Sequence, residues 1–168
     1  VFGAMEFSAA LAAAATTIGY RVTVCDPRSL FATPERFPGV ELAVQWPTGW
    51  LEREISTGSI TDDTAICVLS HDARFDAELI ALALASPAGY VGAMGSRNTH
   101  DRRVASLAER GVNDLTRLHS PIGLDLGVST PAETAISILA EVLAARSHSS
   151  ASPLRSTSGA IHGARVRA

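Results

Sequence analysis

The chain opens with VFGAMEFSAALAAAA (residues 1–15), in which Gly3 lies between an apolar start and an alanine-rich helical segment. A strand, a glycine turn and a helix in this order are typical of nucleotide-binding α/β folds, where the second glycine of the turn admits a pyrophosphate. Met5 stands at the place of that second glycine, and Glu6 adds a negative charge where a phosphate would lie. We therefore expect the fold to be kept and NAD(P) binding to be weak.

Short apolar runs alternate with longer amphipathic ones along residues 1–146. Strand patterns fall at residues 1–3, 20–25, 42–44, 65–69 and 90–91, and helix patterns fall at 6–18, 48–57, 74–85, 97–110 and 130–145. This alternation predicts an α/β fold, a three-layer, doubly wound parallel sheet of Rossmann-like type with five or six strands. The serine-rich residues 147–168 are expected to form a poorly ordered tail.

The last helix has the clearest start signal. Thr130-Pro131-Ala132-Glu133 has the spacing of a capping box with proline at the first helical position. The apolar positions expected to dock on the sheet are Ala132, Ile136, Leu139, Val142 and Leu143.

Composition narrows the classes of function. The formal net charge is −3, which argues against a nucleic-acid partner, and all fourteen basic residues are arginine. Without lysine, Schiff-base chemistry and a Walker-type phosphate lysine are excluded. No apolar run reaches the roughly 18 residues of a membrane span and no signal peptide is visible, so we expect a cytoplasmic protein. The first residue is not Met, and we expect the chain to begin inside a longer protein.

The two cysteines, Cys25 and Cys67, each close an apolar run. Their strands flank the first strand in a doubly wound order, which keeps the two α-carbons beyond the roughly 7 Å limit for a disulfide. We expect both thiols to be buried and reduced.

Candidate ligand sites lie where strands lead into helices, because parallel strands present their carboxyl ends and the following helix N-termini at one edge. The first is the turn Gly3-Ala4-Met5. The second is Asp26-Pro27-Arg28, where Asp26 has the spacing of a ribose-binding carboxylate and Arg28 suits a phosphate. Alternatively, Asp26 only begins a turn with Pro27.

The third candidate is Ser70-His71-Asp72, with Asp76 one turn further along. His71 and the two carboxylates have the chemistry to bind a metal or to carry a proton. A structural alternative is that Asp72 caps the following helix. We assign no metal site.

The fourth candidate, YVGAMGSRNTH, is the most informative. Gly92 and Gly95, followed by Ser96 and Arg97, have the pattern of a nest of free N–H groups beside a guanidinium, which suits an anion. A tight turn capped by Ser96 accounts for part of the pattern. The basic run continues with His100, Arg102 and Arg103. The fifth candidate is the rigid segment 120–127, which contains Pro121 and Gly123 and leads to the helix start at Thr130.

Four segments together resemble one family. FATPERFP, SHDARFD, YVGAMGSRNTHDRR and SPIGLDLGVSTPAETAISILAE, in this order, resemble the Rossmann-type C-terminal domain of the XdhC/CoxI family over residues 1–145. These are accessory proteins of xanthine dehydrogenase and of aerobic carbon monoxide dehydrogenase. The chain departs from the family at Met5, where a glycine is usual, and at Ser70, where threonine is commoner, and the family's small N-terminal domain is absent from these residues.

The resemblance implies a protein that binds molybdenum cofactor (molybdopterin), supports its sulfuration and delivers it to a molybdenum hydroxylase. Its expected partners are that hydroxylase, of the xanthine dehydrogenase or carbon monoxide dehydrogenase type, and a sulfurtransferase. The sequence leaves open whether the chain forms a homodimer. Two other interpretations stay open: an NAD(P)-dependent oxidoreductase, and an interaction domain without a ligand.

Overall fold

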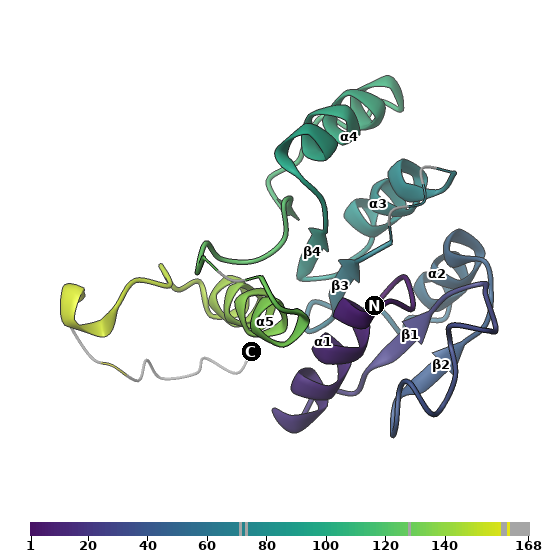
Figure 1. The fold of residues 1–168 in the computed structure, drawn as a ribbon. Helices are drawn as coiled ribbons and strands as arrows, with labels where there is room; N and C mark the ends of the chain where they lie inside the picture. Colours follow the sequence, from purple (N-terminus) through teal and green to yellow (C-terminus); the bar gives the residue numbers. More distant parts are fainter. Residues whose placement is uncertain (71, 73, 128, 159–160, 162–168) are drawn as a thin grey trace.

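The strands form a single parallel layer in the computed structural model, which describes residues 1–70, 72, 74–127, 129–158 and 161 (Figure 1). The strands are β1 (Thr23–Cys25), β2 (Glu41–Ala43), β3 (Ala65–Val68), β4 (Tyr90–Ala93) and β5 (Leu118–His119). β1 pairs with β2, and β4 pairs with both β3 and β5, always in parallel. Phe2 makes parallel bridges to Cys25 and to Val68, so residues 1–3 lie between β1 and β3. The sheet order is β2–β1–Phe2–β3–β4–β5, the doubly wound order of a Rossmann fold.

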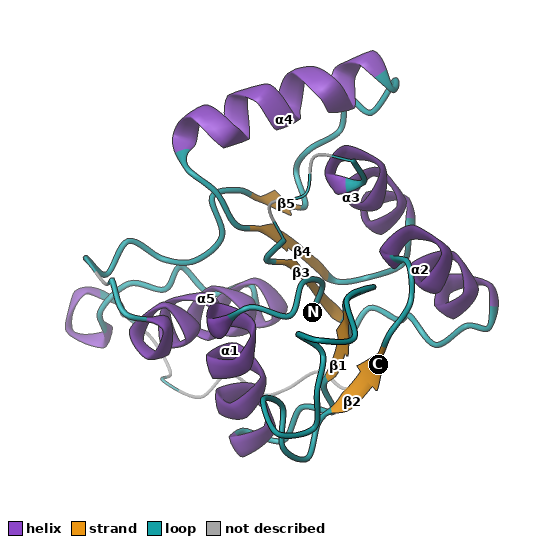
Figure 2. Ribbon diagram, turned by 45° about the vertical axis from the view of Figure 1, so that its right-hand side comes forward, coloured by secondary structure: helices purple, strands orange, loops and turns teal. Residues whose placement is uncertain are grey.

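Helices cover both faces of this sheet (Figure 2). On one face lie α1 (Glu6–Thr17) and α5 (Pro131–Ser147), and on the other lie α2 (Pro47–Ser56), α3 (Asp76–Ala85) and α4 (Arg97–Glu109). Three layers around a parallel sheet confirm the predicted α/β, Rossmann-like fold.

Local signals explain where the long helices begin and end. Thr130 and Glu133 form the expected capping box at the start of α5, with Pro131 in the first turn. Gly111 follows Arg110, the C-cap residue of α4; it has φ +79°, and its N–H donates to the carbonyl of Ala108. Glycine adopts this left-handed conformation without strain, so the helix ends there.

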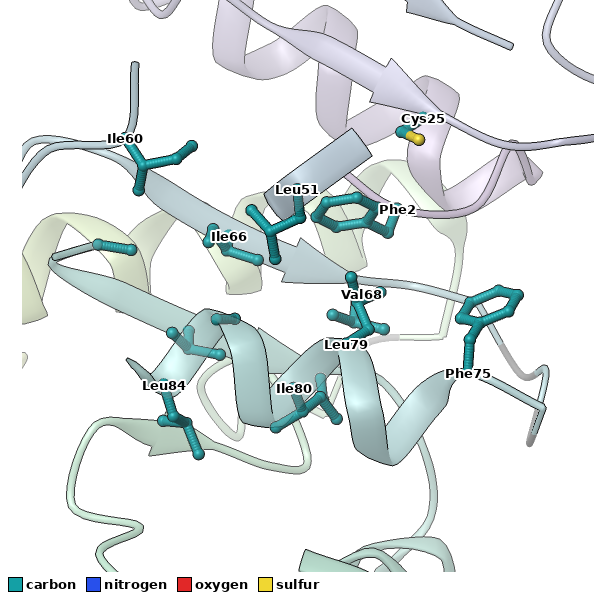
Figure 3. Close-up of a cluster of buried hydrophobic side chains, with 14 of the residues drawn as sticks. Phe2, Cys25, Leu51, Ile60, Ile66, Val68, Phe75, Leu79, Ile80 and Leu84 are labelled. Carbon is teal, nitrogen blue, oxygen red and sulfur yellow. The ribbon is translucent and has the colours of Figure 1, made fainter. Parts of the chain in front are cut away.

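The two larger of three apolar clusters fill the space between the sheet and its helices, one on each face. The cluster under α2 and α3 includes Phe2, Leu51, Val68 and Leu79, all at most 2% exposed (Figure 3). The cluster on the other face joins α1 and α5 to the sheet. Because Phe2 lies in the middle strand and reaches the first cluster, the chain's first residues are part of the core.

Several boundaries differ from the expectations. The strand expected at Tyr20–Cys25 is regular only from Thr23, and β5 has no counterpart among the expected strands. On α5, Leu139 and Val142 are buried as expected, whereas Ala132, Ile136 and Leu143 are exposed. Ala135, Ile138, Leu139 and Val142, which share one helical face, dock on the sheet instead.

The thiols of Cys25 and Cys67 are free and buried, as the sequence predicted. The segment 149–158 runs away from the domain and is exposed throughout (Figure 1). Within the described ranges, no helix combines the length and the apolar character needed to cross a bilayer.

Candidate functional site

A crevice of about 350 Å³ opens at the carboxyl ends of the middle strand, β1 and β3. This is the switch point of the sheet, where the chain winds away in opposite directions and where ligands bind in such folds. Five of the residues singled out in the sequence line the crevice: Gly3, Met5, Asp26, Arg28 and Asp72. Ser70, Arg74 and Phe75 form the wall that follows β3.

Gly3 lets two walls of the crevice approach each other. Its φ is +99°, and a Cβ at this position would lie 2.9 Å from the backbone nitrogen of Ser70. The next N–H, that of Ala4, donates to Asp26 Oδ2 at 2.7 Å. The first turn is therefore fixed to the loops after both neighbouring strands.

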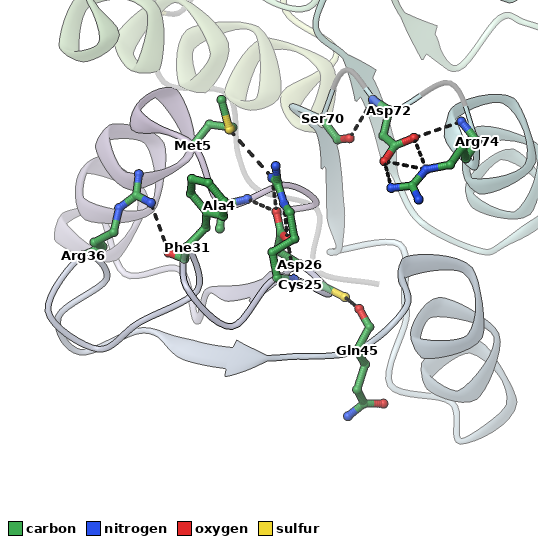
Figure 4. A network of polar contacts seen from close by, with 11 residues as sticks. Ala4, Met5, Cys25, Asp26, Phe31, Arg36, Gln45, Ser70, Asp72 and Arg74 are labelled. Atoms are coloured by element: carbon green, nitrogen blue, oxygen red, sulfur yellow. Dashed lines mark hydrogen bonds and ion pairs between the residues drawn. The ribbon is translucent and has the colours of Figure 1, made fainter.

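Asp26 is a buried carboxylate whose partners are all within the protein (Figure 4). Arg28 donates to Oδ1 from its backbone N–H and Nε, both at 2.9 Å, and to Oδ2 from Nη2 at 2.8 Å. Burial alone would raise the pKa of Asp26, but the bonds from Arg28 and Ala4 outweigh it and lower the pKa. A ribose hydroxyl would therefore have to displace Arg28 to reach the carboxylate. The alternative interpretation of Asp26 as a turn former describes its contacts well.

Asp72 and Arg74 form a similar pair on the opposite wall. The hydrogen bond from the Arg74 side chain is the main cause that lowers the pKa of Asp72 to about 2. The backbone N–H of Asp72 donates to Ser70 Oγ at 3.1 Å. Asp72 does not cap α3, since that helix begins at Asp76 with Phe75 at the N-cap position. His71 lies outside the described residues.

Each of these two arginines, which line the crevice, also lies over an exposed aromatic ring. The guanidinium of Arg28 lies 4.4 Å from the ring centre of Phe31, and that of Arg74 lies 5.4 Å from Trp46. Stacking and ion pairing hold both guanidinium groups in place. The mouth thus presents two positioned cations, each already neutralised by one carboxylate.

Met5 shapes the remaining side of the crevice. It is the N-cap residue of α1, its side chain is partly exposed, and its sulfur lies 3.9 Å from Arg28 Nη2. The side chain thus lies beside the helix N-terminus, where the fingerprint glycine would leave open space, and Glu6 lies in the first turn.

The loop after β4 departs from the expected nest. Gly92 lies inside β4, where a Cβ would lie 2.5 Å from the Ile122 side chain and 2.7 Å from the Tyr90 hydroxyl, so packing explains this glycine. Ser96 caps α4 by accepting from the Thr99 N–H at 3.2 Å, and Gly95 lies against Thr99. Arg97, the first residue of α4, is exposed. None of these residues lines the crevice, and anion binding by Gly95, Ser96 and Arg97 stays a prediction.

In the loop after β5, two backbone N–H groups donate hydrogen bonds to acceptors within the protein. The N–H of Ile122 donates to the Ala93 carbonyl at 3.0 Å, and that of Gly123 donates to Glu141 Oε2 at 2.8 Å. Pro121 follows a cis peptide bond. Pro121 and Gly123 therefore position this loop against β4 and α5, and ligand binding by them stays a prediction.

Two polar clusters were not predicted from the sequence. Glu141 on α5 accepts from the Tyr90 hydroxyl at 2.6 Å and lies 3.4 Å from His119 Nδ1, while the rings of Tyr90 and His119 stack. Arg103 is almost fully buried and pairs with Asp76 at 2.9 Å. The only signal for Arg103 was its place in the basic run, which favours a surface interpretation.

The carboxylate of Asp76 is thereby paired with Arg103 and not with side chains of the Ser70–Asp72 segment. In the part of the chain that the structure describes, no group of three His, Cys, Asp or Glu side chains is arranged to hold a metal ion.

Comparison with known proteins connects this architecture to one family. A sequence model of the XdhC Rossmann domain matches residues 1–142. The chain belongs to the XdhC family. A solved structure of a xanthine dehydrogenase from Bacillus halodurans superposes with a TM-score of 0.75 at 26% identity, covering 88% of this chain and 43% of that one.

Two curated relatives of the XdhC domain carry informative names. A probable xanthine dehydrogenase subunit of Bacillus subtilis is 28% identical over 146 residues, which are 87% of this chain and 42% of that protein. The molybdenum cofactor insertion chaperone PaoD of Escherichia coli is 32% identical over 95 residues, which are 55% of this chain and 30% of that protein. The chain thus spans less than half the length of these relatives.

Proposed function

We propose that this XdhC domain binds molybdenum cofactor in the crevice at the switch point and acts as an accessory protein for a molybdenum hydroxylase. The observation that carries the proposal is the crevice itself, with two positioned guanidinium groups at its mouth, in a chain whose relatives are named for xanthine dehydrogenase and for cofactor insertion. The enzyme served is of the xanthine dehydrogenase or carbon monoxide dehydrogenase type, and the protein works in the cytoplasm.

The residues of the crevice fit such a ligand in size and chemistry. A volume of about 350 Å³ lies within the range of small-molecule sites. Arg28 and Arg74 each use Nε and Nη2 on their own aspartate, which leaves the Nη1 edges for a phosphate arm. The exposed rings of Phe31 and Trp46 lie next to these two arginines, and an aromatic ring suits a flat heterocycle.

The buried thiols bear on the sulfuration step. Cys25 lines the crevice, but its side chain is 1% exposed and donates to the Gln45 carbonyl. Burial raises the pKa of Cys25 to about 12 and that of Cys67 to about 11, so neither is a thiolate at neutral pH. A persulfide carrier needs an accessible thiolate. We therefore propose that a separate sulfurtransferase supplies the sulfur while this domain holds the cofactor.

Mass spectrometry of small molecules released from the purified protein tests the ligand. Molybdopterin is the expected result, whereas NAD(P) or no ligand would contradict the proposal.

Variants of single arginines test the place of binding. Arg74→Ala should weaken cofactor binding about tenfold to a hundredfold, the loss expected for a hydrogen bond to a charged group. Its partner Asp72 is partly exposed, so folding should be unaffected, and the melting temperature serves as a check. Arg110→Ala, at the far end of α4, is the matched control. A loss of binding in Arg97→Ala with full retention in Arg74→Ala and Arg28→Ala would move the phosphate to the loop after β4.

A further inference from the structure

Arg103 binds three segments that lie apart from one another in the sequence. From α4 its guanidinium donates to Asp76 Oδ2 at 2.9 Å, to Ser120 Oγ at 2.8 Å and to the Met94 carbonyl at 3.0 Å. The side chain is 2% exposed. All three of its nitrogen atoms are therefore committed to partners within the protein.

Each partner belongs to a different segment of the carboxyl edge. Asp76 begins α3, and its N–H and that of Phe75 both donate to the Asp72 carbonyl, so Asp76 closes the turn that forms one wall of the crevice. Met94 directly precedes the Gly95–Arg97 segment, and its N–H donates to the Val68 carbonyl. Ser120 begins the loop after β5.

Only arginine can make these contacts at once. A planar fork of five N–H donors reaches a carboxylate, a hydroxyl and a carbonyl in one plane, whereas a lysine ammonium is a compact point charge. A buried charge that loses one partner is costly, so the contacts of the fork tend to persist or fail together.

We infer that Arg103 is a positioning residue that couples the crevice to the loops after β4 and β5. A ligand that orders the turn carrying Asp72, Arg74 and Phe75 then also orders Met94 and the Ser120–Gly123 segment through this one side chain. The role of the crevice as the ligand site rests on the proposed function, while the coupling itself is a property of the chain without ligand.

Hydrogen exchange in the ligand-free protein tests the coupling directly. The reporters are three hydrogen-bonded amides, those of Asp76, Met94 and Ile122. Arg103→Lys keeps the charge but loses the fork, and all three amides should exchange about tenfold faster or more, as expected for losing a hydrogen bond to a charged group. A change at only one of the three would overturn the inference.

Arg117→Lys is the matched control. Arg117 is another multiply bonded arginine, whose guanidinium donates to the carbonyls of Leu84, Ser86 and Ala88 at the opposite end of the sheet. The Arg117→Lys variant should leave the exchange rates of the Met94 and Ile122 amides unchanged. Equal acceleration by both variants would mean general destabilisation and would overturn the coupling.

Ser120→Ala is a milder variant that folds if Arg103→Lys does not. It removes a single hydroxyl, yet exchange at Asp76 should also rise, because the two residues are connected through the guanidinium. An unchanged Asp76 amide would contradict the inference.

The same exchange measurements are then repeated with molybdopterin added. Molybdopterin should slow exchange at Met94 and Ile122 in the unmodified protein and not in Arg103→Lys. Binding in the crevice with no change at these amides would refute the coupling. If molybdopterin does not bind the unmodified protein, the proposed function fails, and the ligand-free measurements still decide the role of Arg103.

Discussion

Replacing Gly3 by alanine separates the backbone strain of the first turn from its close packing. At φ +99° an alanine costs roughly 1–2 kcal/mol, because the left-handed region is unfavourable for a residue with a Cβ. The new Cβ would also lie 2.9 Å from the Ser70 nitrogen, a backbone atom that can yield only if the loop moves. Overpacking of this kind typically adds about 1–3 kcal/mol, so we expect a total loss of about 2–5 kcal/mol of unfolding free energy.

Gly19→Ala is the matched control for this experiment. Gly19 has φ +92°, but a Cβ there would meet nothing within 4 Å. It should therefore lose only the roughly 1–2 kcal/mol due to backbone strain. Urea unfolding of both variants and the unmodified protein gives the two losses on one scale. Equal losses in the two variants would refute the claim that the first turn is held tightly against the loop after β3.

Two further predictions concern titratable groups that are buried or half-buried. Cys25 and Cys67 should both resist a thiol reagent in the native protein and react fully, two thiols per chain, in denaturant; fast reaction of either in the folded state would contradict their burial. Burial alone would raise the pKa of Glu141, but hydrogen bonds from His119, Tyr90 and the Gly123 N–H outweigh it and lower the pKa below its ordinary value of 4.5. The stability that these bonds contribute is therefore fully present above about pH 4.5 and is lost as the pH falls through the lowered pKa. Unfolding free energies measured from pH 7 to pH 3 should decline in the unmodified protein and decline less in Glu141→Gln; parallel profiles would contradict this role of Glu141.

The parts of the fold that the sequence revealed are those with local signals. The capping box at Thr130 and the glycine at residue 111 mark helix ends through contacts within a few residues. The parallel sheet followed from the alternation of strand and helix patterns. β5, with only two residues, carries no periodicity and depends on pairing with β4 for its existence.

The candidate site was harder to predict, because its geometry depends on contacts between distant residues. The spacing of Asp26 from Gly3 correctly indicated that both lie at the same crevice, but not that Arg28 occupies the carboxylate. Gly92 was expected in an anion nest, but it packs against the side chain of Ile122 and against the Tyr90 hydroxyl, which Glu141 anchors from α5. Arg28 lies only two residues from Asp26, but the sequence does not show which way its side chain turns, and Ile122 and Glu141 lie too far from Gly92 in the sequence to be found from its neighbours.

Because Cys25 and Cys67 flank the middle strand, a disulfide between them would report that this strand has left the sheet. The two residues lie on either side of the middle strand, where the N–H of Phe2 donates to the Cys67 carbonyl and that of Gly3 to the Cys25 carbonyl. Strands separated by one intervening strand are about 9.5 Å apart, too far for a disulfide. An oxidised Cys25–Cys67 bridge forms only in molecules whose first residues have left the sheet. Under mild oxidation, the rate at which the bridge forms thus reports how often this strand is displaced.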